Sequence, residues 1–418
     1  MTGKKLRILV LFGGRSPEHD VSIITGLQTL KALDPERYEV APLYVAPDGT
    51  WFYGKSLEDR GVYIPGIEAQ KDLVPVTLDL TPRKRPALIT LPRSFWQVRK
   101  IIEFDVAFIS FHGLIGEDGG IQGLFEVANV PYVGMRPLAS TVLMDKAATK
   151  RMLTGTDVPL LPFWEIKRPA QGLLLTVEEL LSQLKDVTFP CCIKPAHLGS
   201  SIGVAKVKNF QEISDVLATS IFKYDDMALL EPFVENLIEY NVSVRRHGDK
   251  VLTSAIECPK RTADLLDFKT KYVSGGGTKG EGTKTGGGKT GGGKTGGVGL
   301  GQISQGMLSL TREINPDLPP EFESNIRAWA KEIFVRVNGS GAPRLDFLCN
   351  EKTKEIWFNE ANPTPGSFGY FLWEAAKDEP VLFSELLDGL IEEALALHAR
   401  AQIPHDPTPE AARLFPRH

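Results

Sequence analysis

The chain has 418 residues, 42% of them hydrophobic and 24% charged, and its 48 basic and 52 acidic residues leave a net charge of −4. Its length leaves room for two or three domains, and the near-balanced charge excludes a bulk attraction to nucleic acid or to an anionic membrane. No apolar run approaches the roughly 20 residues that a membrane-spanning helix needs.

The N-terminus and the cysteines favour a cytoplasmic protein. Met1-Thr-Gly-Lys-Lys-Leu-Arg leads directly into a strand-like run, so we expect no signal peptide. Four cysteines in a chain of this length do not form a disulfide framework, and we expect reduced thiols. The seven histidines show no zinc-binding spacing.

The first third of the chain alternates strand-like and helical runs, which predicts a parallel sheet covered by helices. Glycine-rich loops follow two of the strands, at Gly13-Gly14 and at His112-Gly113, and ligands bind at such strand ends. The expected strands are 6–12, 41–45, 105–111 and 131–134, and the expected helices are 21–33 and 121–129.

The pattern after residue 134 is a mixture of hairpins and helices. We expect an α+β arrangement there, ending in a Pro-rich tail from residue 403 that is frayed. The expected helices are 139–153, 211–224, 322–334 and 383–401, and the expected strands are 191–194, 203–207, 227–231, 239–246 and 250–259.

Two further strand-like runs, 344–349 and 355–358, carry polar residues at alternate positions. Asp346 therefore shares a face with Arg344, and Glu360 shares one with Asn362. If the strands pair as a hairpin, three oxygen ligands converge beside one arginine, a set that suits Mg²⁺ holding nucleotide phosphates. A charged strand pair at the rim of a sheet is the alternative.

Lys194 ends an apolar strand and precedes Gly199-Ser200-Ser201, whose backbone N–H groups could close over phosphate oxygens. An ordinary hairpin turn is the alternative. Glu231 and Glu239 could accept from adenine or ribose, or lie solvated at strand ends. Glu18, beside the first glycine pair, could hold an ammonium group, although capping of the next helix also explains acidic residues there.

The segment 275–301 is almost pure Gly, Lys and Thr, so it has nothing to bury and predicts a flexible loop. Within it, the run from Gly288 to Thr295 fits the P-loop pattern. A P-loop needs a buried strand before it and a helix after it. Since the flanks are again Gly, Lys and Thr, we reject a P-loop NTPase.

Several motifs follow one another along the chain. In order, they are Gly13-Gly14-x-Ser16-x-Glu18-x-x-Val21-Ser22, His112-Gly113-x-x-Gly116-Glu117-Asp118-Gly119, Met144-Asp145-Lys146, Ile193-Lys194-Pro195 with Gly199-Ser200-Ser201-x-Gly203, Lys271-Tyr272, Arg344-x-Asp346 and Asn359-Glu360-x-Asn362-x-x-Pro365-Gly366. This series resembles that of D-alanine–D-alanine ligases of the ATP-grasp superfamily. The resemblance extends from about Leu6 to Ala396, apart from the Gly/Lys/Thr segment.

The resemblance implies an ATP-grasp fold of mixed α/β and α+β class. An N-terminal parallel α/β domain (1–134) would precede two α+β lobes (135–232 and 233–402) that enclose ATP, with the insert 275–301 in the closing loop and a tail at 403–418. The implied reaction joins two D-amino acids, D-alanine in both positions, through an acyl phosphate for peptidoglycan precursor synthesis. The resemblance also implies a homodimer and two Mg²⁺ ions, with Mn²⁺ as a substitute.

The resemblance assigns roles to individual residues. The ATP-binding set would be Lys146, Lys194, Gly199, Ser200, Ser201, Glu231, Glu239 and Lys271, and the metal ligands Asp346, Glu360 and Asn362. The catalytic set would be Glu18, Ser200, Tyr272 and Arg344, with Glu18 holding the first ammonium group and Arg344 stabilising the oxyanion of the tetrahedral intermediate. The substrate pocket would add His112, Lys271, Gly366, Ser367 and Phe371.

One departure concerns the second substrate. Phe371 stands where the family usually has a serine that binds the carboxylate of the acceptor, and Ser367 could substitute for it only from another place. An ATP-grasp amino-acid ligase with a different acceptor, serving specialised metabolism, is therefore the main alternative. An inactive ATP-binding protein is less favoured, because the Lys, Arg, Asp, Glu and Asn positions are intact.

Overall fold

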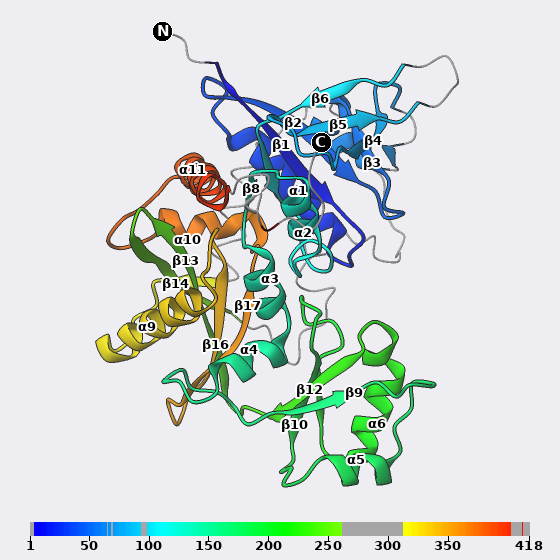
Figure 1. The fold of residues 1–418 in the computed structure, drawn as a ribbon. Coiled ribbons are helices and arrows are strands. Elements are labelled where there is room, and N and C mark those ends of the chain that lie inside the picture. Colours follow the sequence, from blue (N-terminus) through cyan, green and yellow to red (C-terminus); the bar gives the residue numbers. More distant parts are fainter. Residues whose placement is uncertain are drawn as a thin grey trace, which may run out of the picture.

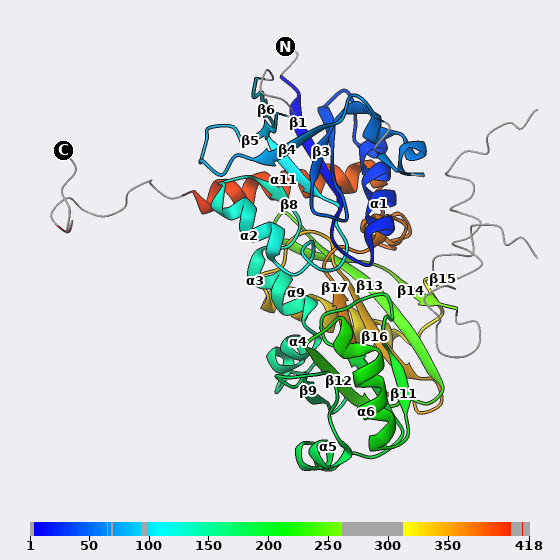
Figure 2. The ribbon, with the colours of Figure 1, turned by 90° about the vertical axis from the view of Figure 1, so that its right-hand side faces the viewer.

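The computed structural model describes residues 4–64, 66–67, 70–92, 98–260, 312–402 and 412. These residues form three β-sheets, of eight, four and five strands, with helices packed against each (Figures 1 and 2). No helix within the described ranges is long and apolar enough to cross a membrane. Lys271, Tyr272 and the segment 275–301 lie outside the described residues, as does nearly all of the tail.

The first sheet has the strand order β6-β5-β4-β3-β2-β1-β7-β8. The parallel pairing predicted from the sequence is confirmed for β2, β1, β7 and β8. Short antiparallel strands extend the sheet from β3 to β6, in a region that the sequence left unassigned. The strands are β1 (Leu6–Gly13), β2 (Tyr38–Val45), β3 (Trp51–Tyr53), β4 (Val74–Leu78), β5 (Ala87–Thr90), β6 (Ile101–Glu103), β7 (Val106–Ile109) and β8 (Tyr132–Val133).

Helices from both ends of the chain complete the first sheet. The helices α1 (His19–Ala32) and α2 (Gly120–Val127) are local, whereas α11 (Phe383–Ala401) comes from the far end of the chain and lies beside β8 (Figure 1). Leu386 and Leu390 of α11 are buried in one cluster with Val10 and Phe12 of β1. The last helix is therefore part of the N-terminal core.

The second sheet is antiparallel, with the order β11-β10-β12-β9. Its strands are β9 (Trp164–Lys167), β10 (Cys191–Pro195), β11 (Ala205–Val207) and β12 (Met227–Pro232), and the helices α5 (Val177–Gln183) and α6 (Phe210–Thr219) lie on it (Figure 1). A 3₁₀ turn over Ile221–Lys223 ends the helix that we expected to reach residue 224.

The single helix expected over 139–153 is wrong, because the chain forms two helices there. These are α3 (Pro137–Met144) and α4 (Lys146–Leu153), and Asp145 between them is extended. The Asp145 carboxylate accepts hydrogen bonds from the N–H groups of Ala147 and Ala148, at 2.9 and 3.0 Å. Aspartate is a favoured N-terminal cap because it satisfies N–H groups that have no partner within the helix. Lys146 thereby becomes the first residue of α4.

The third sheet is also antiparallel, with the order β15-β14-β13-β16-β17. The predicted hairpin is confirmed, since Asp346 on β16 lies opposite Glu360 on β17, and Arg344 lies opposite Asn362. The elements are β13 (Leu237–His247), β14 (Lys250–Pro259), β15 (Arg312–Ile314), α9 (Pro320–Arg336), β16 (Arg344–Asn350), β17 (Ile356–Asn362) and α10 (Tyr370–Glu374).

Candidate active site

A cavity of about 480 Å³ lies between the second and third sheets. Leu161, Val204 and Leu348 give it apolar walls, and charged side chains converge on it from both sheets. This combination of apolar walls with a few convergent polar groups is typical of a nucleotide or small-molecule site. Six of the residues that the sequence assigned to ATP or metal line the cavity: Lys146, Lys194, Ser201, Glu231, Glu239 and Glu360.

A buried cluster of two lysines and one glutamate forms one side of the cavity. The two oxygens of Glu231 pair with Lys150 Nζ at 2.5 Å and with Lys194 Nζ at 2.6 Å. Lys194 also donates to Asn359 Oδ1 of β17 at 2.8 Å. Burial raises the pKa of Glu231, but the charges of Lys194 and Lys150 outweigh burial, so the net shift is downward and the carboxylate stays ionised.

Sequence reasoning missed Lys150. It lies four residues after Lys146, on the same face of α4, and that spacing was the available signal. Burial lowers the pKa of Lys194, but the charge of Glu231 outweighs burial, so the net shift is upward and Lys194 presents a positive charge to the cavity. Glu231, which we expected near adenine or ribose, has both oxygens occupied by lysines in this structure.

Lys146 connects three elements at the edge of the cavity. Its Nζ donates to the Leu198 carbonyl at 2.7 Å and pairs with Glu360 Oε2 at 3.2 Å. Its backbone N–H donates to the Ala196 carbonyl at 3.1 Å. The start of α4, the loop after β10 and strand β17 are therefore held together by one lysine.

The hairpin of β16 and β17 places a carboxylate pair beside an arginine. Arg344 holds Asp346 with two hydrogen bonds of 2.7 Å each, and Asn362 Nδ2 donates to Asp346 at 3.0 Å. Burial raises the pKa of Asp346 to about 7, against the opposing effect of Arg344, and Glu239 and Glu360 add to the rise. Buried, mutually repelling carboxylates with an amide oxygen are hard ligands that a divalent cation would stabilise, so these residues fit Mg²⁺.

Polar side chains continue from this pair along one row of the third sheet. Glu360, Asp346, Asn241 and Glu257 lie in register on four adjacent strands, so they share one face. Asn241 donates to Glu257 at 3.1 Å. Sequence reasoning missed Asn241 and Glu257, because their alignment with Asp346 follows from strand pairing that no local pattern shows.

The row of polar side chains ends at Arg312, which contacts Phe371, the residue that departs from the family pattern. Arg312 of β15 pairs with Glu257 at 2.7 Å. Its guanidinium carbon lies 4.6 Å from the centre of the Phe371 ring, a cation–π contact. Phe371 is therefore next to a charged group that belongs to the same face of the sheet as Asp346.

Glu18 meets the loop after β10 from the first sheet. Its carboxylate accepts a hydrogen bond from the Ser200 hydroxyl. Gly113 makes this approach possible, since its φ is +73° and a Cβ there would lie 2.7 Å from Glu18 Oε2. A Cβ on Gly199 would lie 3.3 Å from the same oxygen. The structure thus brings Glu18 and the predicted phosphate loop together, while Tyr272 lies outside the described residues.

His112 and Glu117 join the loop after β7 to the rest of the site. His112 Nε2 lies 2.8 Å from Thr25 Oγ1, and burial lowers the pKa of His112 to about 4. Glu117 accepts from the backbone N–H groups of Gly113 and Thr364, both at 2.6 Å. Glu117 therefore ties this loop to the segment after β17, a role that the sequence did not indicate.

Gly366 begins a short 3₁₀ turn that follows β17. Ser367 in this turn has a φ of 50°, in the left-handed region, and is held by two contacts with α1. Its N–H lies 3.2 Å from Thr25 Oγ1, and its hydroxyl donates to the side chain of Gln28. In this structure Ser367 therefore fixes the turn to α1.

The fold and the family models together define an ATP-grasp enzyme, an ATP-dependent ligase. The family model "D-ala D-ala ligase N-terminus" matches residues 7–135, and "D-ala D-ala ligase C-terminus" matches 152–283 and 308–392. The chain is 30% identical to a D-alanine–D-alanine ligase of Thermosipho africanus over 388 residues, covering 92% of both chains. The chain belongs to the D-alanine–D-alanine ligase family.

Solved structures establish the same fold. The D-alanine–D-alanine ligase from Coxiella burnetii superposes with a TM-score of 0.70 at 24% identity, covering 95% of this chain and 96% of that one. The D-alanine–D-alanine ligase from Bacillus anthracis, determined in complex with ATP, gives a TM-score of 0.60 at 20% identity, covering 96% of this chain and 100% of that one.

Proposed function

We propose that this chain joins two molecules of D-alanine to D-alanyl-D-alanine, with ATP as the energy source, in the cytoplasm and as a homodimer. The observation that carries the proposal is that three groups reach one cleft through residues that line it, namely Lys194, Glu360 and Ser201, the neighbour of Ser200. The three groups are the Lys150–Glu231–Lys194 cluster, the Arg344–Asp346–Glu360 set, and Glu18 with its Ser200 contact. A carboxylate–amine ligase needs a phosphate site, an oxyanion site and an ammonium site side by side.

The nucleotide would lie between the second and third sheets. Its adenine would rest on the apolar walls with Glu239 near the ribose, and its phosphates would point to Lys146, Lys194 and the loop 199–201. Asp346, Glu360 and Asn362 would hold two Mg²⁺ ions, or Mn²⁺ in their place, which neutralise the charge of the transferred phosphoryl group.

The chain's own residues then account for the two chemical steps. Glu18 would fix the ammonium group of the first D-alanine. The carboxylate of that D-alanine then attacks the γ-phosphate of ATP, and ADP leaves. The amine of the second D-alanine attacks the carbonyl of the acyl phosphate, and Arg344 stabilises the oxyanion until phosphate departs. By the family resemblance, Tyr272 would act with Ser200 and Glu18, and Lys271 and Tyr272 would belong to the loop that closes the site against water.

A different acceptor is the second candidate, and Phe371 favours it. A phenyl ring offers no hydrogen bond to the carboxylate of a second D-alanine, and its only charged neighbour among the contacts described above is Arg312. The donor half of the reaction would remain the same.

The proposal is tested by measuring ADP and phosphate formation with ATP, Mg²⁺ and a panel of D- and L-amino acids, and by identifying the dipeptides. We expect the highest turnover with D-alanine alone, and D-alanyl-D-alanine as the product. Turnover that requires D-alanine plus a different second amine would favour the other acceptor. Absence of ADP with every D-amino acid would contradict both candidates, and light scattering tests the dimer.

A further inference from the structure

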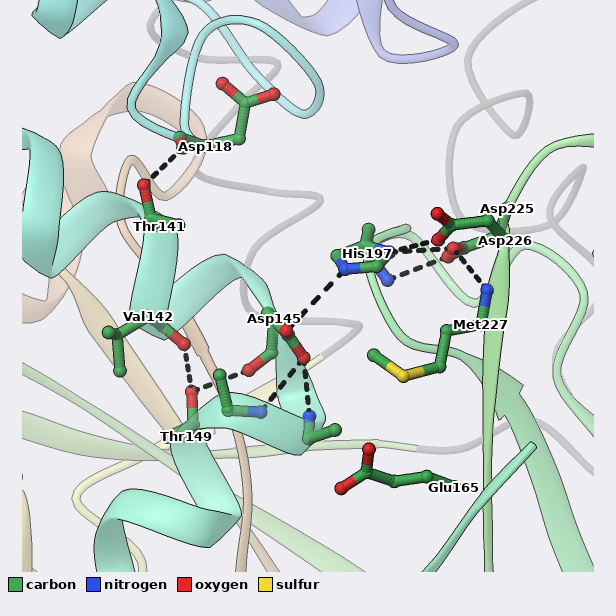
Figure 3. A network of polar contacts seen from close by, with 12 residues as sticks. Asp118, Thr141, Val142, Asp145, Thr149, Glu165, His197, Asp225, Asp226 and Met227 are labelled. Carbon is green, nitrogen blue, oxygen red and sulfur yellow. Dashed lines mark hydrogen bonds and ion pairs between the residues drawn. The ribbon is translucent and has the colours of Figure 1, made fainter. Parts of the chain in front are cut away.

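His197 precedes the Gly199–Ser201 segment in the chain, and its side chain lies between Asp225 and Asp145 (Figure 3). Its backbone N–H donates to Asp225 Oδ2 at 2.8 Å, and its ring Nδ1 lies 2.7 Å from Asp225 Oδ1. On the other side of the ring, Nε2 lies 3.7 Å from Asp145 Oδ2. The imidazole thus bridges the turn before β12 and the N-terminal cap of α4.

The two carbonyl groups that hold Lys146 belong to the residues on either side of His197. The Ala196 carbonyl accepts from the Lys146 backbone N–H at 3.1 Å, and the Leu198 carbonyl accepts from Lys146 Nζ at 2.7 Å. A movement of the His197 backbone would therefore displace both of these carbonyl groups. It would also displace the adjoining Gly199–Ser201 segment.

The positions of the carboxylates favour a protonated ring. Both ring nitrogens face a carboxylate, and only imidazolium has an N–H on each nitrogen. Interactions with Asp145 and then Asp225 raise the pKa of His197 to about 10. Three further sets of charged groups face the ring or its partners. Asp226 lies 3.7 Å from Nδ1 of His197, and Lys167 and Arg168 line the hollow that His197 also lines. Arg151 lies 4.0 Å from the Asp145 carboxylate.

His197, Asp225 and Asp226 are also spaced closely enough to take up a metal ion. Two observations favour the proton instead. The separation of 2.7 Å between Nδ1 and Asp225 Oδ1 is a hydrogen-bond distance. Both Asp225 oxygens are already used, since Oδ1 also accepts from the Met227 N–H at 3.1 Å and Oδ2 from the His197 N–H.

We propose that His197 is a positioning residue for the phosphates of the nucleotide. Held between Asp225 and Asp145, its imidazolium fixes the loop 196–201 against the start of α4 and so keeps Lys146 Nζ and the loop N–H groups in place. The inference rests on the proposed function, because it takes Lys146 and this loop as the phosphate site. His197 is not among the residues that line the proposed nucleotide cavity.

The test compares His197→Ala, His197→Arg and the wild type by dissociation constants for ATP and adenosine and by steady-state kinetics. We expect His197→Ala to weaken ATP binding about tenfold and to raise the KM for ATP more than it lowers kcat, because Lys146 loses its fixed position. Adenosine, which has no phosphate, should bind as before. His197→Arg keeps the charge and several donors, so it should recover most of the ATP affinity. His247→Ala, an exposed histidine at the end of β13, is the matched control.

Asp145→Ser separates the charge contact from the helix cap, because serine caps helices well but carries no charge. It should raise the dissociation constant for ATP as much as His197→Ala does, and the double variant should bind ATP no more weakly than either single variant. Equal weakening of ATP and adenosine, or an unchanged ATP constant in His197→Ala, would overturn the proposal. Stoichiometric Zn²⁺ on the purified wild type would also overturn it. Lys194→Ala serves as the reference: if it leaves ATP binding intact, the proposed phosphate site itself is misplaced.

Discussion

Glu231 holds Lys150 and Lys194 on the two oxygens of a single carboxylate, 2.5 and 2.6 Å away. All three side chains are almost fully buried, so water cannot compensate a missing partner. The carboxylate determines where both ammonium groups lie, and one of them, Lys194, lines the cavity. Glu231 therefore links the stability of the second sheet to the placement of the proposed phosphate site.

Glu231→Gln should destabilise the protein and weaken ATP binding together. Loss of one partner from a buried ion pair costs about 3–5 kcal/mol, because the charges that remain are buried without compensation. The measurements are urea unfolding and ATP binding by calorimetry. Glu39→Gln is the control, since Glu39 pairs with Arg7 at the surface, away from the cavity, and its side chain is 60% exposed. Equal small effects for both variants would contradict the role of Glu231.

Glu360→Gln should leave the fold intact and abolish ligation. The change removes one of the two carboxylates that lie opposite each other on β16 and β17, and with it a charge that we propose is shared between metal ions. Turnover measured over a range of Mg²⁺ concentrations checks the loss of ligation, and circular dichroism checks the fold. Glu355→Gln is the control, because Glu355 lies in the exposed turn between these strands. Near-normal turnover at saturating Mg²⁺ would remove Glu360 from the metal site.

The β16–β17 hairpin was predictable because its pattern is local. Polar and apolar residues alternate over 344–349 and 355–358, and a short turn joins the two runs, so register and face follow from period two. Asp346, Glu360 and Arg344 accordingly meet as the sequence indicated. The resemblance to ATP-grasp ligases could also be recognised from the sequence, since it depended on several motifs that stand in order along the chain.

The remaining relationships depend on contacts that no local pattern encodes. His197 meets Asp225, which is 28 positions away, and the apolar face of α11 predicted a helix without indicating which sheet would bury it. Burial of apolar surface has no directional preference, so the pattern of an amphipathic helix does not identify the surface against which the helix packs. Asn241 and Glu257 joined the polar row only because the strand register placed them there.

Replacement of Lys289 and Lys294 by alanine should barely change turnover. Both lysines belong to the P-loop-like run in the Gly/Lys/Thr segment. The flanking sequence is again Gly, Lys and Thr, and not the apolar strand pattern and helical pattern that a P-loop needs. Steady-state kinetics and ATP binding of the double variant are compared with those of Lys194→Ala, which should lose ATP affinity. If the double variant lost ATP binding and Lys194→Ala kept it, the nucleotide site would lie in the segment instead.

His112 should make the protein less stable as the pH falls from 6.5 to 4. Burial lowers the pKa of His112 from 6.5 to about 4, so in this range the unfolded chain binds a proton that the folded chain does not. The contribution of neutral His112 to the free energy of unfolding is fully present above pH 6.5 and is lost on acidification. The whole loss is about 3 kcal/mol. Urea unfolding of wild type and His112→Gln at pH 7.5 and 4.5 should show a smaller loss in the variant. His247→Gln, an exposed control, should behave as wild type.

The last prediction concerns Phe371, where the chain departs most from the family pattern. Its ring lies under the guanidinium of Arg312, and the hydroxyl of Ser367 already donates to Gln28. Neither observation provides a hydroxyl donor for the carboxylate of an acceptor at this place. We therefore expect the second D-alanine to bind more weakly than the first, and Phe371→Ser to tighten binding of the acceptor while the donor constant stays nearly unchanged.

A hydrogen bond to a charged group contributes about 1.5–3 kcal/mol, so the acceptor constant should improve by about tenfold or more. Phe371→Leu is the matched control, because it removes the ring and its contact with Arg312 without adding a hydroxyl. Kinetics that separate the two D-alanine sites distinguish the outcomes. Tightening in Phe371→Ser alone supports a missing hydrogen bond, whereas equal changes in both variants point to the space that the ring occupies. A change confined to the donor constant, or no change in either constant, would mean that Phe371 does not line the acceptor pocket.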